Sequence, residues 1–254
     1  MAGAALLVAW ARRAPRLITL TTDFGEGSPY VAAMKARLLE GFPAATLIDV
    51  GHAVPAHDVL SGAFVLWAGT RHFGEGAVHL AVVDPGVGSE RRPVAFQLGG
   101  SFYVGPDNGL FGLVLAESAV APSAVVELRR HPDASPTFEG RDVFAPAAAA
   151  LCSGRALRSL GSTVTGPLAT LPVRSPAVLW VDRFGNLVTS LKPPAAALRV
   201  NGHEISAVAR TFSEAPRDTP FLYLGSMGFI EVGVREARAD QRLGARAGSP
   251  VELL

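Results

Sequence analysis

The chain has 254 residues, of which 49% are hydrophobic and 18% are charged, and its formal net charge is +1 at pH 7. A mean hydropathy of +0.30 excludes intrinsic disorder, because this much apolar chain can build one or two packed domains. The near-zero charge argues against a nucleic-acid partner. The single cysteine, Cys152, excludes a disulfide framework and is predicted to be a core thiol in an Ala-rich helix. No apolar run reaches the roughly 18 residues of a membrane span.

Residues 1–16 are predicted to be a short extension before the first strand. The apolar stretch 4–10 precedes its positive charges, Arg12, Arg13 and Arg16. A secretory signal has its charges before the apolar stretch and a small-residue cleavage site after it. We therefore expect a cytoplasmic protein, with a poor export signal as the alternative.

Strand-like and helix-like segments alternate over residues 17–166. The predicted strands are 17–21, 46–50, 78–83, 94–98, 101–104 and 125–128, and the predicted helices start at Ser28-Pro29 or span 58–67, 108–117 and 145–151. Ser28 and Pro29 suit the N-cap and first helical position, and Gly99-Gly100 suits a hairpin. The alternation predicts an α/β domain with a mostly parallel sheet and helices on both faces.

The character of the sequence changes after residue 166. Three prolines within residues 167–176 are typical of a linker. Seven short strand-like runs follow, at 177–181, 187–191, 198–200, 204–207, 221–224, 229–234 and 251–254. Asn201-Gly202 is a strong hairpin turn, and no helix is predicted. Residues 177–254 are therefore expected to form a small all-β, barrel-like domain, which leaves a cleft between the two domains or between neighbouring subunits.

Two predicted strands of the first domain end in acidic, glycine-rich turns. Asp23 lies in segment 21–25 (TTDFG) and Asp84 in segment 84–88 (DPGVG). Ligands of open parallel sheets bind beyond the carboxyl ends of the strands. An aspartate there can hold a ribose diol or orient a water. The alternative is that each aspartate only caps its turn, but two such turns on one sheet edge favour a functional site.

Several familiar sites are absent from the sequence. Gly86–Gly88 lacks the third glycine of a dinucleotide fingerprint, and no P-loop lysine motif occurs. Segment 225–228 (GSMG) has the wrong spacing for a nucleophile elbow. His52, His57 and Asp58 match no zinc spacing, so the histidines are predicted to lie at the surface or to be satisfied within the core.

Three further segments each allow two readings. Segment 105–109 (GPDNG) has helix-capping chemistry and is expected to be mainly structural. Segment 138–142 (FEGRD) precedes an apolar helix and could be an N-terminal cap with a solvated arginine. Segment 182–186 (DRFGN) could stack on and hydrogen-bond a purine, or form a turn with a core phenylalanine.

Five segments, in the order in which they occur along the chain, resemble the motifs of a known family. The chain contains TTDFG at 21–25, VDPGVG at 83–88 followed by Arg91, GPDNG at 105–109, TFEGRDVFAP at 137–146 and DRFGN at 182–186. It resembles the S-adenosyl-L-methionine (SAM) hydroxide adenosyltransferases, relatives of the fluorinating and chlorinating enzymes that act on the same substrate. The resemblance runs from about residue 17 to the C-terminus.

The resemblance implies an architecture and a binding site. It implies homotrimers that hold SAM between the α/β domain of one subunit and the β-barrel domain of the next, with no cofactor and no metal. On the α/β side, Asp23 would bind the ribose hydroxyls and Tyr30 would also contact substrate. On the barrel side, the residues implied to contact the methionine or adenine parts are Asp182, Phe184, Asn186 and Ser226.

The resemblance also implies a water-handling triad of Asp, Arg and His. Asp84 and Arg91 match its first two members, whereas Glu139 stands at the histidine position. We hypothesise that Glu139 shares a proton with Asp84 or pairs with Arg91 or Arg141, and acts as a general base. Two smaller departures are Ser28 and Gly225, where the family usually has Asp and Asn.

The implied reaction is hydrolysis of SAM to adenosine and L-methionine, by attack of water or hydroxide on the ribose 5′ carbon. A thioether leaves without needing a proton, so the demand on the protein is to prepare the nucleophile. Carboxylates at Asp84 and Glu139 would repel a halide, which favours water. The alternatives are a SAM-dependent halogenase, and a catalytically weak protein that binds SAM or adenosine.

Overall fold

The computed structural model describes residues 16–171, 173 and 176–254. Residues 1–15, nearly all of the predicted extension, and three residues of the predicted linker lie outside this description. Within the described part, no helix is long and apolar enough to cross a membrane.

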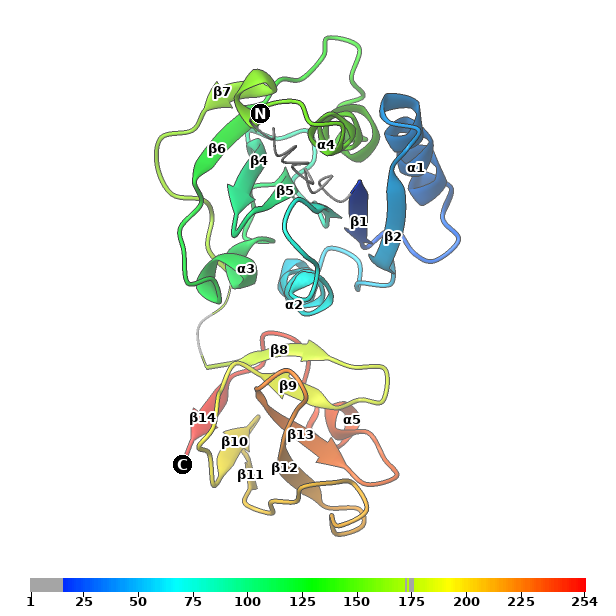
Figure 1. The fold of residues 1–254 in the computed structure, drawn as a ribbon. Coiled ribbons are helices and arrows are strands. Elements are labelled where there is room, and N and C mark those ends of the chain that lie inside the picture. Colours follow the sequence, from blue (N-terminus) through cyan, green and yellow to red (C-terminus); the bar gives the residue numbers. More distant parts are fainter. Residues whose placement is uncertain (1–15, 172, 174–175) are drawn as a thin grey trace, which may run out of the picture.

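The first part of the chain forms one sheet with helices on both faces (Figure 1). Its strands are β1 (Leu17–Thr22), β2 (Thr46–Gly51), β3 (Val78–Val82), β4 (Pro93–Leu98), β5 (Ser101–Pro106), β6 (Ala124–Leu128) and β7 (Gly161–Thr163). Its helices are α1 (Pro29–Gly41), α2 (Val59–Thr70), α3 (Gly112–Ala116) and α4 (Ala145–Cys152), with a π-helical turn at Gly140–Phe144 and a 3-10 turn at Leu157–Ser159. The strand order is β2-β1-β3-β5-β4-β6-β7.

The predicted α/β class is confirmed, but the sheet is mixed rather than mostly parallel. Strands β2, β1, β3 and β5 are parallel, whereas β4, β6 and β7 join by antiparallel pairing. The reason lies at Gly99 and Gly100, whose φ angles of 56° and 85° reverse the chain between β4 and β5. A two-residue connection of this kind can only join antiparallel strands.

Local sequence signals start the two long helices. The Ser28 side chain accepts a hydrogen bond from the backbone N–H of Tyr30, and Pro29 is the first residue of α1. The Asp58 carboxylate accepts from the backbone N–H of Ser61 at 2.9 Å and caps α2. Both caps satisfy backbone donors that have no partner inside the helix.

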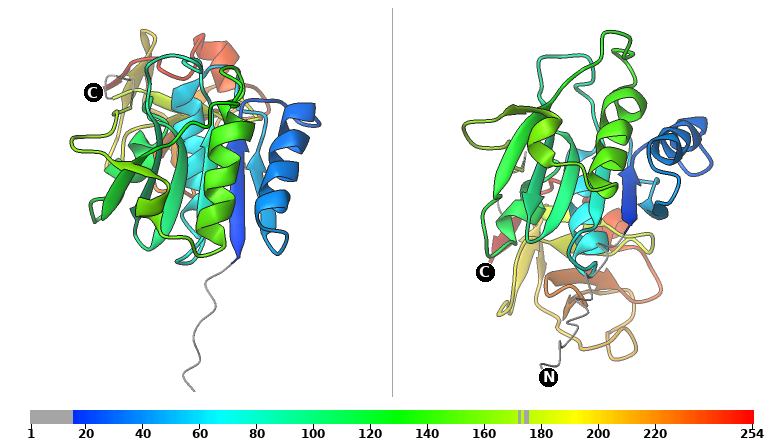
Figure 2. Two further views of the ribbon diagram at one scale, coloured as in Figure 1. Left: turned by 90° about the horizontal axis from the view of Figure 1, so that it is seen from above. Right: turned by 45° about the horizontal axis from the view of Figure 1, so that its top comes forward.

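The helices form two layers that cover the sheet. α1 and α4 pack together on one face, as Figure 2 shows from above, and α2 and α3 lie on the other (Figure 1). α2 is apolar on nearly all sides because the sheet covers one of its faces and the C-terminal part of the chain covers another. Phe64 of α2 stacks on Trp180 at 5.2 Å between ring centroids, and Trp67 meets Phe229 edge-on at 5.3 Å.

The C-terminal part is a small β structure around its own core, as predicted. One antiparallel sheet has β8 (Val178–Val181), β9 (Leu187–Thr189), β12 (Pro220–Leu224) and β13 (Ile230–Val234); the other has β10 (Leu198–Val200), β11 (His203–Ile205) and β14 (Val251–Leu253). Buried side chains of both sheets share one apolar cluster. The prediction of no helix here is wrong, because α5 (Ala239–Leu243) forms one short turn that ends at Gly244, with φ 56°.

The predicted helix 108–117 is much shorter than expected. Only α3 is helical, because Asn108 ties the preceding segment into a turn. Its amide donates to the carbonyl of Val83 at 2.9 Å, and its side-chain oxygen accepts from the N–H of Leu110 at 3.2 Å. Gly109 has φ 99°, which no helix accommodates. The structural role expected for segment 105–109 is thus a tertiary anchor for the end of β3.

Candidate active site

The turn that follows β3 carries Asp84 to the carboxyl edge of the parallel strands. The turn closes through the N–H of Val87, which donates to the carbonyl of Asp84 at 3.2 Å. Gly88 has φ 79°, and a Cβ there would lie 2.9 Å from the carbonyl of Pro136. Only glycine therefore lets the β3 turn approach the segment that carries Glu139.

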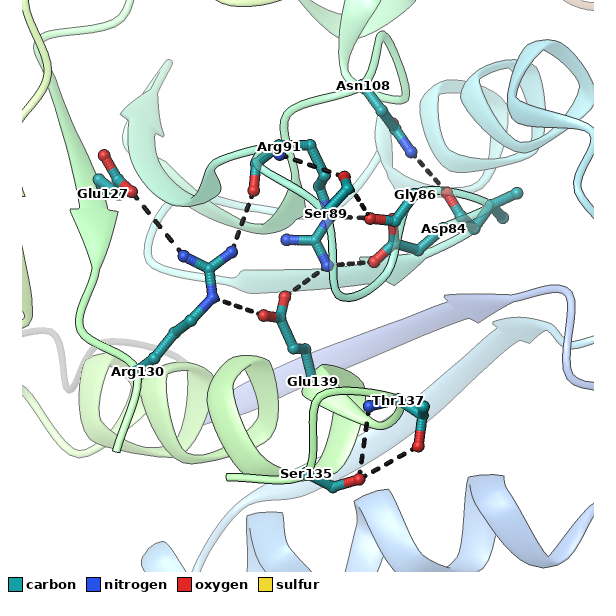
Figure 3. Close-up of polar contacts among 11 residues, drawn as sticks. Asp84, Gly86, Ser89, Arg91, Asn108, Glu127, Arg130, Ser135, Thr137 and Glu139 are labelled. Atoms are coloured by element: carbon teal, nitrogen blue, oxygen red, sulfur yellow. Dashed lines mark hydrogen bonds and ion pairs between the residues drawn. The ribbon is translucent and has the colours of Figure 1, made fainter. Parts of the chain in front are cut away.

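Asp84, Arg91 and Glu139 meet at this approach (Figure 3). The Nε of Arg91 donates to Asp84 Oδ1 at 2.9 Å, and its Nη2 pairs with both Asp84 Oδ2 and Glu139 Oε2. All three side chains are buried, none being more than 9% exposed. Of the hypothesised partners of Glu139, the structure therefore selects Arg91, which stands between the two carboxylates. Arg141 instead pairs with Asp142 at 2.7 Å.

The carboxylates determine the protonation of Arg91. Burial by itself would lower its pKa, but hydrogen bonds and charges from Asp84 and Glu139 outweigh that effect and raise the pKa above the usual value. The guanidinium also lies over the ring of Phe144, 5.3 Å from its centroid. Arg91 is thus a permanent cation held by two acids and an aromatic face.

A second arginine, which the sequence reading missed, completes this arrangement. Arg130 follows β6 and donates from Nε to Glu139 Oε1 at 2.6 Å and from Nη2 to the carbonyl of Arg91 at 3.0 Å (Figure 3). We call Asp84, Arg91, Arg130 and Glu139 the charge cluster. Arg130 could have been predicted only from the antiparallel pairing of β6 with β4, which places the end of β6 beside the start of β4. Nothing local in the sequence reveals that pairing.

A hollow of about 330 Å³ opens beside the charge cluster. Asp23 and Tyr30 line it together with Asp84 and Glu139, so four of the residues predicted for the α/β side share one cavity. We call it the acidic hollow. The carbonyl end of β1 brings Asp23 there, and Asp23 Oδ2 accepts from the backbone N–H of His57 at 2.8 Å.

Aromatic side chains form one wall of the acidic hollow. Tyr30 meets Phe24 edge-on at 5.9 Å and Phe138 at 5.2 Å between centroids. Tyr30 is nevertheless 57% exposed. An aromatic wall beside carboxylates suits a ligand that has both an apolar ring and a cationic or hydroxylated part.

The residues predicted for the barrel side do not reach the acidic hollow within this chain. Phe184 and Asn186 line a separate hollow of about 520 Å³, together with Phe212, Val234, Glu236, Ala237 and Arg238. We call it the aromatic hollow. Phe184 is 75% exposed, whereas Asn186 is buried. The alternative of a core phenylalanine in segment 182–186 is therefore wrong.

Asp182 shapes the turn that presents Phe184. Its Oδ1 accepts from the backbone N–H groups of Phe184 and Asn186, both at 2.8 Å, and its Oδ2 accepts from the Asn186 amide at 2.8 Å. Gly185 has φ 87°, and a Cβ there would strike Arg238 and Asp240. The Arg238 guanidinium, another residue not predicted, donates to the carbonyl of Arg183 at 2.8 Å and fixes the same turn.

Ser226 lies in neither hollow. It is exposed in the turn between β12 and β13, where the N–H of Gly225 donates to the carbonyl of Phe229 at 2.9 Å. Behind this turn, Glu231 accepts a hydrogen bond from the Tyr223 hydroxyl at 2.6 Å. Burial is the main cause that raises the pKa of Glu231, and the charge of Asp182 adds to it.

The other candidates have structural partners. His52 is buried, with Nδ1 2.9 Å from the hydroxyl of Thr22 and Nε2 3.0 Å from Asp49 Oδ1. Burial raises the pKa of the Cys152 thiol. Over the described ranges, no group of three or more His, Cys, Asp and Glu side chains is arranged to hold a metal ion.

Solved structures with the same fold include two from thermophiles. An uncharacterized conserved protein from Thermotoga maritima is 29% identical, with a TM-score of 0.84, and a conserved hypothetical protein from Thermus thermophilus is 42% identical, with a TM-score of 0.82. Each comparison covers 94% of this chain and 100% of the other.

Two curated relatives are similar over nearly the whole chain, and a third over about two thirds of it. The (R)-S-adenosyl-L-methionine hydrolase of Thermus thermophilus is 43% identical, covering 94% of this chain and 100% of the relative, and that of Salinispora arenicola is 40% identical, covering 93% and 97%. A fluorinase from Actinopolyspora mzabensis is 27% identical over 69% of this chain and 71% of its own length.

Family models match both parts of the chain. The N-terminal domain of the SAM hydroxide adenosyltransferases matches residues 18–161, and the C-terminal domain of the same family matches residues 176–252. With the shared fold and the near full-length relatives, these matches place the chain in a single family. The chain belongs to the SAM hydroxide adenosyltransferase family.

Proposed function

We propose that this protein hydrolyses SAM to adenosine and L-methionine. The observation that carries the proposal is the acidic hollow, in which Asp23 and Asp84 lie at the ends of neighbouring parallel strands with the Asp84–Arg91 pair behind them. Four relatives named (R)-S-adenosyl-L-methionine hydrolase support it.

The reaction is a displacement at the ribose 5′ carbon. A water oxygen forms the new bond to this carbon, the carbon–sulfur bond breaks with its electron pair going to sulfur, and the water gives up a proton. Asp84 orients the water and accepts that proton, and Arg91 favours the developing hydroxide by its charge. Methionine leaves as a neutral thioether, so no general acid is needed. Attack of hydroxide on a sulfonium neutralises charge, and a partly apolar hollow that a neighbouring subunit closes off from water favours such a step.

Substrate contacts complete the proposal. Asp23 binds the ribose hydroxyls and Tyr30 covers the acidic hollow. Asp182, Phe184, Asn186 and Ser226 bind the adenine and methionine parts from a neighbouring subunit of a homotrimer. This arrangement accounts for two hollows on one chain, because Asp23 and Tyr30 line one of them and Phe184 and Asn186 line the other.

The relatives' names refine the substrate. In (R)-S-adenosyl-L-methionine, the L already fixes the amino-acid carbon, so R describes the sulfonium. We propose that this chain also acts on the sulfonium epimer of R configuration, in the cytoplasm, and without a cofactor or metal.

Isotope labelling tests the reaction. The protein is incubated separately with each sulfonium epimer in ¹⁸O-water containing chloride, and the nucleoside is analysed by mass spectrometry. Label on the 5′ oxygen of adenosine, formed from the R epimer, is the expected result. A 5′-chloro nucleoside, or tight binding of SAM without turnover, would instead identify the halogenase or the binding protein.

A further inference from the structure

Glu139 is surrounded by cationic partners inside the charge cluster. Its carboxylate is only 3% exposed, and each oxygen faces a different arginine, Oε1 facing Arg130 and Oε2 facing Arg91 (Figure 3). Glu139 lines the acidic hollow beside Asp84, but two arginines hold its carboxylate, whereas one arginine holds that of Asp84. This geometry suits an anchor for Arg91 better than the general base hypothesised from the sequence.

Arg130 reaches both ends of Arg91. Its Nε holds Glu139, which holds the Arg91 guanidinium, and its Nη2 holds the Arg91 backbone carbonyl at 3.0 Å. Arg130 thus closes a ring of contacts around Arg91. Its own side chain is 39% exposed, and its further contact with Glu127 is long, at 4.0 Å between two partly exposed groups. That outer contact contributes little.

The number of charges explains why a second arginine is needed. Asp84 and Glu139 bring two negative charges to a buried place, and Arg91 supplies only one positive charge. An uncompensated buried carboxylate is costly, and removing one partner of a buried ion pair is strongly destabilising. Without Arg130, Glu139 would compete with Asp84 for the single guanidinium of Arg91.

We propose that Arg130 is a positioning residue for the hydrolytic reaction, which balances Glu139 and thereby leaves Arg91 aligned on Asp84. The inference rests on the proposed function. Arg130 does not line the acidic hollow, so it acts through Glu139 and Arg91 rather than on the substrate.

A double-mutant cycle tests this role. Arg130→Met is expected to lower kcat about 10- to 100-fold with KM changed less than about twofold, because the displaced group is Arg91 and not a substrate contact. In a Glu139→Gln background, Arg130→Met should lower kcat less than about threefold, because a neutral amide needs no counter-charge. Arg130→Lys, which keeps the charge, should recover most of the kcat.

Arg129 provides a matched control. It is an exposed arginine beside Arg130 at the end of β6, and Arg129→Met is expected to leave kcat and KM unchanged. An equal loss from Arg130→Met in both backgrounds, or a loss confined to KM, would refute the proposal. If Arg130→Met does not fold, Arg130→Gln replaces it in the cycle, because it removes the charge and keeps N–H donors.

Thermal unfolding separates this inference from the proposed function. If the unchanged protein produces no adenosine, the proposed hydrolysis of SAM is refuted, but the pairing of Arg130 with Glu139 can still be measured. Arg130→Met should lower Tm by roughly 3 °C more in the unchanged background than with Glu139→Gln. Equal decreases would refute the coupling independently of any activity.

Discussion

The charge cluster and the aromatic hollow differ in how complete they are within one chain. In the cluster, Asp84, Arg91 and Glu139 are buried and form ion pairs with one another, and Arg130 pairs with Glu139 on the outer side. In the aromatic hollow, Phe184 is 75% exposed and no aromatic ring pairs with it among the described residues. One site is already organised, whereas the other presents an apolar surface that has yet to be covered.

This difference separates reactivity from recognition. Buried charges must be positioned by the fold itself, because an unpaired one would destabilise the chain. An exposed aromatic ring carries no such penalty, and it gains free energy when a ligand or a second subunit removes it from water. We therefore expect substitutions in the cluster to change kcat and substitutions in the aromatic hollow to change KM.

The largest effect is expected at Asp84. Asp84→Asn removes the proton acceptor and one anchor of Arg91, so kcat should decrease about 10²- to 10⁴-fold. Adenosine release followed by chromatography measures it. Asp107→Asn is the control, because Asp107 also pairs with an arginine, Arg92, but does not line the acidic hollow. Comparable kcat losses in the two variants would remove Asp84 from the mechanism.

Mixing of subunits tests whether the two hollows complement each other. Asp84→Asn and Phe184→Glu should each be nearly inactive alone. We assume that one site combines the acidic hollow of one subunit with the aromatic hollow of the next. Refolding the two variants together in equal amounts should then restore about a quarter of the sites, because each half of a site is unmutated in about half of the cases. Activity is compared before and after mixing, with the oligomer checked by light scattering. No recovery from a mixed oligomer would place both halves of the site within one chain.

A smaller effect is expected when only the exposed ring is removed. Phe184→Ala should raise KM about tenfold and leave kcat within a few-fold, because stacking on a base contributes about 1–3 kcal/mol. Steady-state kinetics measure both parameters. Val208→Ala is a suitable comparison, since Val208 is also exposed, at 64%, but lies outside the aromatic hollow. An equal rise of KM in both variants would contradict a specific contact.

A further effect concerns stability rather than activity, namely how the free energy of unfolding depends on pH. Burial lowers the pKa of His79 to about 4 from 6.5, so between these values the unfolded chain binds more protons than the folded one. Stability should decrease as the pH falls from about 6.5 to about 4, by at most about 3 kcal/mol, and then level off.

His79 is buried in β3, where it contacts Thr19 and Tyr103, whereas the histidine of the C-terminal part, His203, is exposed. Acid should therefore loosen the α/β part first. Hydrogen exchange resolved along the chain, at pH 7 and pH 4.5, measures this order. Equal loss of protection in both parts, or an unchanged acid sensitivity in His79→Gln, would show that His79 is not responsible.

Local signals in the sequence predicted much of this structure. Ser28 and Asp58 start helices, Gly99-Gly100 turns a hairpin, and the turns after β1 and β3 present Asp23 and Asp84. These features depend on neighbours only a few residues away, so the sequence specifies them directly. The grouping of Asp84, Arg91 and Glu139 was also predicted, through the order of the motifs.

Tertiary structure decided the rest. The antiparallel joining of β4 and β6 brought Arg130 to Glu139, and the anchoring of Asn108 on Val83 shortened a predicted helix to α3. Both depend on contacts between segments 9 to 33 residues apart. Such contacts depend on which strands and turns, among all those of the chain, bury the most surface and form the most hydrogen bonds. A short stretch of sequence does not determine that outcome.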